Sequence, residues 1–272
     1  MTFGKCLLTG TNGTFVKSHL TPLALTSPTS GEYFIQSGEG SRPTRAYTSW
    51  YDKTIVTRKG EDILAAIDAQ AICILHELKL VWSGWSHEET SLSVQEFTRI
   101  DDSHGIRRVR HNNLQELRLF FVSLLWRWGV SKLPAAAEII LPQQDIDELR
   151  NLLLRMDSGN PTFYPVTLTQ LSTRGPRQNL SPLSQEIPSH DDENRSYPIF
   201  RFYFDGLIAH IHRSSALIAD PANPMVLGAT DAIVIPTVTY KASSQHVNLQ
   251  AGIRDAYQEH STSMRKLASH TD

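Results

Sequence analysis

The spacing of hydrophobic positions predicts three helices. From 60 to 82 apolar residues recur at three- and four-residue steps, which is the pattern of a helix with one buried stripe. Segment 113–130 is apolar on most of its surface, so we expect it to lie at the centre of the molecule. A third helix is predicted over 143–157, where leucines alternate with charged residues. The stripe of the first helix consists of Ile63, Ile67, Ala71, Ile74 and Leu78.

Short apolar segments bounded by turn residues predict strands in much of the remaining chain. Strands are expected within 93–100, 162–171, 198–215 and 231–243. Asp205-Gly206 divides the third of these segments into two strands, because this pair favours a tight hairpin turn. Segment 172–198 holds four prolines and a charged run, so we expect a mobile loop there. Segment 247–267 predicts a terminal helix.

This order of elements predicts an α+β fold with central helices and a β-rich C-terminal part. Residues 1–60 are rich in Gly, Thr, Ser and Pro, which favours turns and hairpins over helices. We therefore expect a small hairpin–helix module within residues 1–90. An α+β domain over 91–272 would follow it.

The composition of the chain indicates its cellular location more clearly than its function. The net charge is −2 over 272 residues, so binding to nucleic acid would need a local basic patch. Two cysteines cannot form a disulfide framework, and no charged-then-apolar leader opens the chain. The longest apolar run, at 119–126, is too short to span a membrane. We therefore expect a cytoplasmic protein without membrane contact.

Three segments, in their order, resemble a known arrangement. They are "FVKSHLTPLAL" (15–25), "WYDKTIVTRKGEDILAAIDAQA" (50–71) and "LFFVSLLWRWGVS" (119–131). Together they are similar to uncharacterised bacterial and prophage proteins with an HNH-like N-terminal module. The resemblance covers about residues 3–160 and implies a treble clef over residues 1–90. In that fold a β-hairpin and a helix are held by zinc, usually through two Cys-x-x-Cys pairs.

The resemblance also implies catalytic positions. In HNH-like nucleases a histidine at the end of the hairpin is the general base, and a divalent metal stabilises the scissile phosphate. His19 stands at the position of the base, and Asp68 at that of the acidic helix residue that holds the metal. An active enzyme would need a divalent metal such as Mg²⁺. Taken alone, a histidine before a proline-containing turn is more typical of capping or packing.

The zinc ligands of the resembling proteins are mostly missing here. Cys6 is present, but its expected partner position is Thr9, and the second pair falls on Thr57 and Gly60. One thiolate cannot hold a structural zinc, so we expect that the structural zinc is lost and the module is degenerate. Packing would then hold the hairpin, through the helix at 60–82 and the aromatic residues Phe15, Trp50 and Tyr51.

Basic residues form two clusters that can contact phosphates. The first cluster follows the hairpin and consists of Lys53, Arg58 and Lys59. The second consists of Arg107, Arg108 and Arg110. The alternatives are a solvated loop or a site for an acidic protein partner. His210 and His212 point the same way if they lie on a strand, so they could share a metal. The alternative for this pair is the polar face of an edge strand.

These observations lead to three hypotheses on function. The first is a component of a bacterial or prophage defence-type system, whose degenerate HNH-like module binds nucleic acid or a partner. The second is an active metal-dependent HNH-type nuclease. The third is a protein–protein interaction subunit without nucleic-acid binding, in which the helix around Trp126 and Trp128 or the β-rich part forms the interface. A protein partner or homo-oligomer is expected in either binding role.

Overall fold

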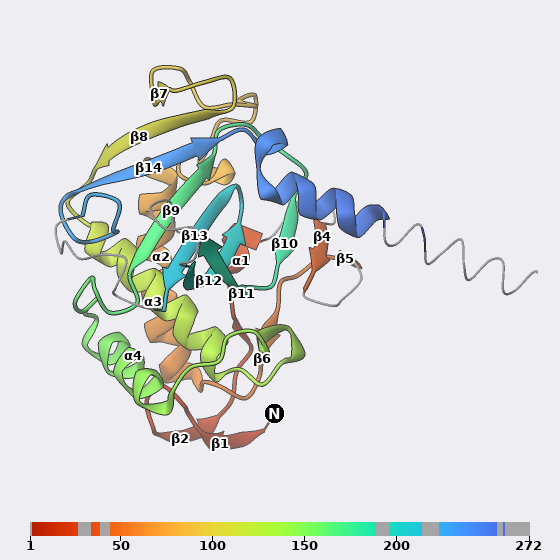
Figure 1. The fold of residues 1–272 in the computed structure, drawn as a ribbon. Helices are drawn as coiled ribbons and strands as arrows, with labels where there is room; N and C mark the ends of the chain where they lie inside the picture. Colours follow the sequence, from red (N-terminus) through yellow and green to blue (C-terminus); the bar gives the residue numbers. More distant parts are fainter. Residues whose placement is uncertain are drawn as a thin grey trace, which may run out of the picture.

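The fold is α+β and is built around a seven-stranded mixed sheet (Figure 1). The computed structural model describes residues 2–26, 34–38, 44–188, 196–213, 223–254 and 258. All neighbouring strands of this sheet run antiparallel except β9 and β14, which are parallel. Across the sheet the strands are β11 (Leu183–Pro188), β12 (Ser196–Phe204), β13 (Leu207–His212), β9 (Val166–Leu171), β14 (Ala232–Val238), β8 (His104–Arg110) and β7 (Thr98–Arg99).

Three long helices pack with one another and with this sheet (Figure 1). They are α2 (Arg58–Glu77), α3 (Leu114–Val130) and α4 (Gln143–Arg155). The Phe121 ring on α3 stacks on Phe204 of β12, with 6.2 Å between the ring centroids. Within the described residues, no helix is both long and apolar enough to cross a membrane.

α3 is the central helix, as its composition predicts. Thirteen of its seventeen residues are buried, because a helix that is apolar on all sides must be covered on all sides. Trp126 and Trp128 are 0% and 1% exposed, so neither side chain is free to form an interface with a partner. The expectation of an interface at these two residues is therefore wrong.

The N-terminal part consists of short strands arranged around α2. The described residues form three small sheets here: β1–β2, β3–β6 and β10–β4–β5. One buried cluster extends from Cys6 through α2 and α3 to the large sheet, so the core is continuous across the boundary predicted at residue 90. The short elements are β1 (Phe3–Lys5), β2 (Asn12–Thr14), β3 (Ser18–His19), α1 (Leu23–Thr26), β4 (Phe34–Ser37), β5 (Thr44–Ala46), β6 (Tyr51–Asp52), β10 (Gln178–Leu180), η1 (Trp82–Gly84), η2 (Pro134–Ala136) and η4 (Tyr240–Ala242).

The hairpin at Asp205-Gly206 is confirmed. These residues have φ values of 48° and 83°, the left-handed conformation that a type I′ turn requires at both central positions. α2 ends earlier than predicted, at Glu77, because Lys79 adopts φ 50° and turns the chain away from the helix. α3 and α4 match the segments predicted as helices.

The predicted strand at 93–100 and the predicted mobile loop at 172–198 are both corrected. Within 93–100 only Thr98–Arg99 forms a strand, and the long strand is β8, which includes the arginines for which a solvated loop was an alternative. Segment 172–198 contains β10 and β11, which pair with β4 and β12, so this part of the expected mobile loop is regular structure. Residues 189–195 lie outside the described residues. At the C-terminus residues 244–254 are helical, and nearly all of the remaining predicted helix lies outside them as well.

Shortening a buried leucine of α3 should destabilise the protein strongly. Leu124 is 0% exposed, and we expect Leu124→Ala to lower the free energy of unfolding by roughly 2–5 kcal/mol through lost burial and a new cavity. Urea unfolding followed by circular dichroism measures the change. Leu154→Ala on α4 is the matched control, because Leu154 is 39% exposed and should cost less than about 1 kcal/mol. Equal losses in both variants would contradict the central position of α3.

Candidate functional site

The turn of the β1–β2 hairpin meets the first turn of α2. Cys6 is buried, and its Sγ accepts a hydrogen bond from the backbone N–H of Thr9 at 3.4 Å. Burial raises the pKa of the Cys6 thiol, but hydrogen bonds with Thr9 and Thr57 outweigh it, and the net shift is downward. A Cβ added to Gly60 would lie 2.8 Å from Cys6 Sγ. The four positions that the resemblance assigns to zinc ligands therefore lie around one point.

The residues at this point do not suit a structural zinc. Only Cys6 supplies a thiol there, whereas threonine and glycine do not replace thiolates at such a site. The Cys6 sulfur also lies in the space that a side chain on Gly60 would need. Among the described residues, no group of three histidine, cysteine or acidic side chains could hold a metal ion.

Hydrogen bonds and packing hold the hairpin to the rest of the protein. The Leu7 N–H donates to the Ile55 carbonyl at 2.8 Å. Arg150 of α4 donates through Nε to the Leu8 carbonyl, and the Leu8 side chain is fully buried. Of the aromatic residues expected to pack here, Trp50 meets Trp128 edge-to-face with ring centroids 5.7 Å apart. The Phe15 ring lies against Gly4, which leaves no space for a larger residue at that position.

Arg127 joins three elements at the centre of this region. Its guanidinium donates to both carboxylate oxygens of Asp68 on α2, with Nη1 and Oδ2 3.1 Å apart. The same group donates to the Ser123 hydroxyl on α3, and Nη1 donates to the His19 carbonyl of β3 at 3.1 Å. The Arg127 side chain is only 2% exposed and that of Asp68 17%. Arg127 is therefore paired with an acid inside the protein.

The pairing conflicts with the role of metal ligand predicted for Asp68. Both of its carboxylate oxygens accept hydrogen bonds from Arg127, and a metal ion would have to displace a buried guanidinium to bind there. His19 and Asp68 do lie in one neighbourhood, as the resemblance implies, because Asp68 acts on the pKa of His19. However, Arg127 contacts the backbone carbonyl of His19 and not its ring.

The His19 imidazole is half-buried beside Tyr51. Its Nε2 lies 3.4 Å from the Thr48 hydroxyl, and its ring meets Tyr51 edge-on at 6.0 Å. Burial lowers the pKa of His19, and the positive charges of Lys17 and Arg127 lower it further, while Asp68 opposes them. His19 is therefore neutral at pH 7 and retains a basic nitrogen.

Glu61 is a half-buried acid that the sequence analysis missed. Burial raises the pKa of this carboxyl; Ser18 and the charge of Arg127 oppose the shift, and Asp68 adds to it. Neither Glu61 Oε2 nor Ser18 Oγ has a hydrogen-bond partner of good geometry among the described residues. The sequence signal for Glu61 was its position directly after Gly60, in the first turn of α2. That signal does not single it out, because an acid in the first turn is also the ordinary partner of a helix N-terminus.

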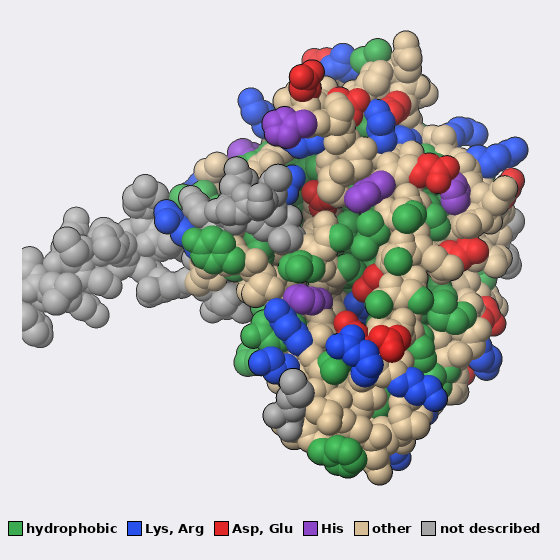
Figure 2. Space-filling model, turned by 180° about the vertical axis from the view of Figure 1, so that it is seen from behind, with side chains coloured by type: hydrophobic (Ala, Val, Ile, Leu, Met, Phe, Trp, Pro, Cys, Tyr) green, Lys and Arg blue, Asp and Glu red, His purple; other side chains and the backbone are tan. Residues whose placement is uncertain are grey.

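Lysines flank the half-buried ring of Tyr51. Lys17 Nζ lies 4.1 Å from the ring centroid and Lys53 Nζ 5.5 Å from it. Arg58 and Lys59 are exposed at the start of α2, and Arg58 lies 3.9 Å from Asp62. Figure 2 shows Lys and Arg side chains gathered near a histidine on one face, with acidic side chains between them. We call Lys17, His19, Tyr51 and Lys53 the Tyr51 patch; Lys17 is a member that the sequence analysis missed.

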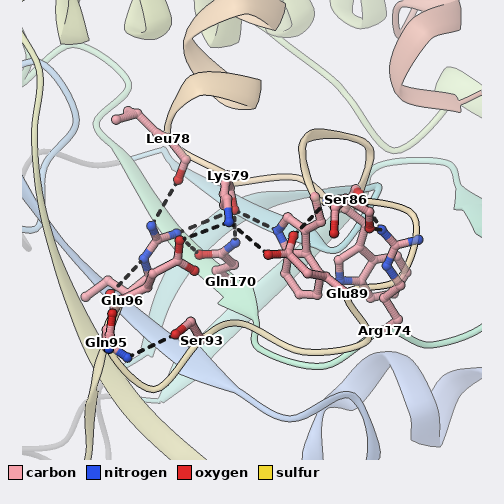
Figure 3. A network of polar contacts seen from close by, with 12 residues as sticks. Leu78, Lys79, Ser86, Glu89, Ser93, Gln95, Glu96, Gln170 and Arg174 are labelled. Atoms are coloured by element: carbon pink, nitrogen blue, oxygen red, sulfur yellow. Dashed lines mark hydrogen bonds and ion pairs between the residues drawn. The ribbon is translucent and has the colours of Figure 1, made fainter.

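The three arginines of the second basic cluster do not form one surface patch, because they lie on a strand whose side chains point alternately to opposite faces of the sheet. On β8 successive side chains alternate between faces, so Arg107 points inward and Arg108 and Arg110 outward. Arg107 is buried and donates to the carbonyls of Leu78, Lys79 and Glu96 and to the Gln170 side chain. Figure 3 shows this polar network, where Lys79 also binds Glu89 and Glu96. Arg107 therefore has a structural role, and Arg110 lies 3.6 Å from Asp231.

His210 and His212 share one face of β13, as predicted for a strand. His212 Nε2 lies 3.0 Å from the Thr167 hydroxyl. Burial lowers the pKa of His212 to about 4; burial with the charges of Arg201 and His212 lowers that of His210 to about 3. A metal would need a third ligand, and among the described residues no histidine, cysteine or acidic side chain joins this pair; Asp205 accepts from the Ser83 N–H, and Asp231 lies 3.6 Å from Arg110.

Comparisons of the chain with protein-family models, with curated proteins and with solved structures found no match. The function is therefore inferred from the geometry of the residues themselves. That geometry offers a neutral histidine, a basic-aromatic surface and an acidic residue held by an arginine.

Breaking the Arg127–Asp68 pair should be costly. We expect Arg127→Met to lower the free energy of unfolding by about 3–5 kcal/mol, because it leaves the Asp68 carboxylate largely buried without its partner. Arg127→Met combined with Asp68→Leu should recover a large part of this loss, which chemical denaturation would measure. The exposed pair Arg155–Glu148 is the control, and Arg155→Met there should cost at most about 1 kcal/mol. No recovery in the double variant would contradict the pairing.

Acidification should destabilise the protein partly through His212. The unfolded chain takes up a proton near the ordinary histidine pKa of about 6.5, whereas the native His212 does so only near a pKa of about 4. The unfolded state therefore binds more protons between these values, and stability falls as the pH falls through this window. The free energy of unfolding, measured from pH 7 to pH 4, should fall less steeply in His212→Gln than in the wild type. Parallel curves would show that His212 is not the group concerned.

Proposed function

We propose that this chain is a binding component whose HNH-like hairpin–helix module acts as a scaffold for nucleic-acid contact and not as a nuclease. The observation that carries this proposal is the capture of Asp68 by Arg127. A phosphodiester-cleaving site of this type needs a free carboxylate for its metal, close to the general base. Here an internal cation takes the place of that metal.

The Tyr51 patch supports the binding role. Lysines beside a half-buried aromatic ring combine phosphate attraction with a partly accessible surface on which a base can stack. The cations at the start of α2 extend the positive surface, and the helix N-terminus itself favours anions. A single-stranded or unpaired nucleic acid is the ligand that this combination fits best, because its bases are open to stacking.

The biological setting rests on the three-segment resemblance alone. We propose a bacterial or prophage origin, a cytoplasmic location and a defence-type system, with further protein subunits or copies of the chain as partners. The nuclease alternative is supported by the neutral imidazole of His19, which could accept a proton if Asp68 were released. A purely protein-binding role has no support from the Trp126 and Trp128 helix, whose side chains are buried.

Binding should depend on the patch and on salt. We expect the wild type to bind a fluorescein-labelled single-stranded 20-mer in anisotropy titrations, with an affinity that falls as salt rises. Lys17→Gln with Lys53→Gln should lower the slope of log affinity against log salt by about 1–2, since each phosphate contact contributes roughly 0.7 on single strands. Arg108→Gln with Arg110→Gln is the control with equal charge change on the distant sheet face. Equal effects in both pairs, or no binding at 50 mM salt, would refute the proposed interface.

Cleavage distinguishes this proposal from the nuclease alternative. We expect no nicking of supercoiled plasmid by the wild type with Mg²⁺ or Mn²⁺, because the carboxylate is held by Arg127. Nicking that is present in the wild type and lost in His19→Ala would overturn the non-catalytic role. Nicking that persists in His19→Ala would identify a contaminating enzyme and leave the expectation for this site intact.

A further inference from the structure

Four arginines are buried in the described part of the chain, and one of them lacks the partners that the others have. Arg107 and Arg118 each donate to several carbonyl or amide oxygens, and Arg127 donates to a carboxylate, a hydroxyl and a carbonyl. Arg201 on β12 is only 7% exposed, yet within the described residues its one hydrogen bond is to the Ser244 hydroxyl.

This difference matters energetically. A buried cation without an anion or enough acceptors is expensive, because the protein interior does not replace its lost hydration. Burial lowers the pKa of Arg201, and Tyr203 is the group that opposes this shift. Among the described residues that line the space beside Arg201 there is no aspartate or glutamate. The missing counter-charge is therefore the feature to explain.

Arg201 opens onto a groove of about 510 Å³. The groove lies between the sheet and the start of the helical residues 244–254, the blue helix that follows β14 in Figure 1. His210 stands directly opposite Arg201 in the β12–β13 pairing and also lines the groove. Apolar walls are supplied by Ile199, Ile208 and Pro236. The groove thus combines one fixed cation, one neutral imidazole and an apolar surface.

We propose that this groove binds a small organic anion, with its carboxylate or phosphate group on Arg201 and its apolar or aromatic body against the isoleucines. The guanidinium retains unused N–H donors, which suit a carboxylate or phosphate oxygen pair. His210 supplies a hydrogen bond to a second polar atom of the ligand. The volume suits a molecule of metabolite size, such as an aromatic acid or a nucleoside monophosphate. This site is separate from the Tyr51 patch and does not depend on the proposed function.

Matched charged and neutral probes test the site. Indole-3-acetate against indole-3-acetamide tests a carboxylate, and adenosine 5′-monophosphate against adenosine tests a phosphate. Isothermal titration of the full chain should show at least tenfold tighter binding of the charged member of one pair, which also identifies the head group. In Arg201→Met that preference should disappear, whereas Arg108→Gln on the exposed part of the same sheet face should retain it.

Stability of the free protein provides an independent measurement. If Arg201 lacks its counter-ion, Arg201→Met should unfold at the same or a higher temperature than the wild type, because it removes an unpaired buried charge and keeps the apolar stem. The preferred charged probe should raise the melting temperature of the wild type and not that of Arg201→Met. Failure of both charged probes to bind more tightly than their neutral partners, a preference that survives in Arg201→Met, or a clear loss of stability in the unliganded variant would each overturn the proposal.

Discussion

The desolvated contact between Arg127 and Asp68 is the constraint on which the N-terminal half depends. Arg127 enters the site from α3, the most buried helix, and its guanidinium holds α2 through Asp68 and β3 through the His19 carbonyl. Burial of both charges makes the contact sensitive to the loss of either partner. Arg127 also fixes the backbone of the half-buried His19 and lowers the pKa of its ring, while Asp68 opposes this shift.

The hairpin shows how a small finger-like unit can be ordered by a neighbouring core. Units of this size often depend on a metal, because their own apolar surface is insufficient. Here Leu8 is buried in the cluster that α2, α3 and α4 share, and Arg150 binds the turn from outside. The unit is thus part of the main core and not an independent lobe. This also explains why a domain boundary drawn from local composition does not correspond to a gap in the packing.

The periodicity of apolar residues predicted the helices whose side chains are buried. It failed for segments whose structure depends on polar contacts with distant parts of the chain. The helix 114–130 was predictable because its apolar surface leaves no face for water. The turn at Asp205 was predictable because an Asp-Gly pair favours the left-handed backbone conformation that the turn adopts. The arginines of β8 were predicted as one phosphate-binding cluster, since no spacing rule shows that Arg107 has carbonyl acceptors from distant segments. The candidate site was predictable at His19 and Asp68 as positions. Their connection through Arg127 depends on three-dimensional proximity between residues far apart in sequence.

The close contact between Gly60 and the Cys6 sulfur limits how this protein can change. A cysteine introduced at position 60 alone would bring its Cβ within 2.8 Å of that sulfur, so the first step towards a thiolate cage would be crowded before any ion could relieve it. Single substitutions at positions 9 or 57 would add thiols without completing a tetrahedron. A four-ligand thiolate site at this point would therefore require several coordinated replacements, because each single one either crowds the Cys6 sulfur or leaves the ligand set incomplete.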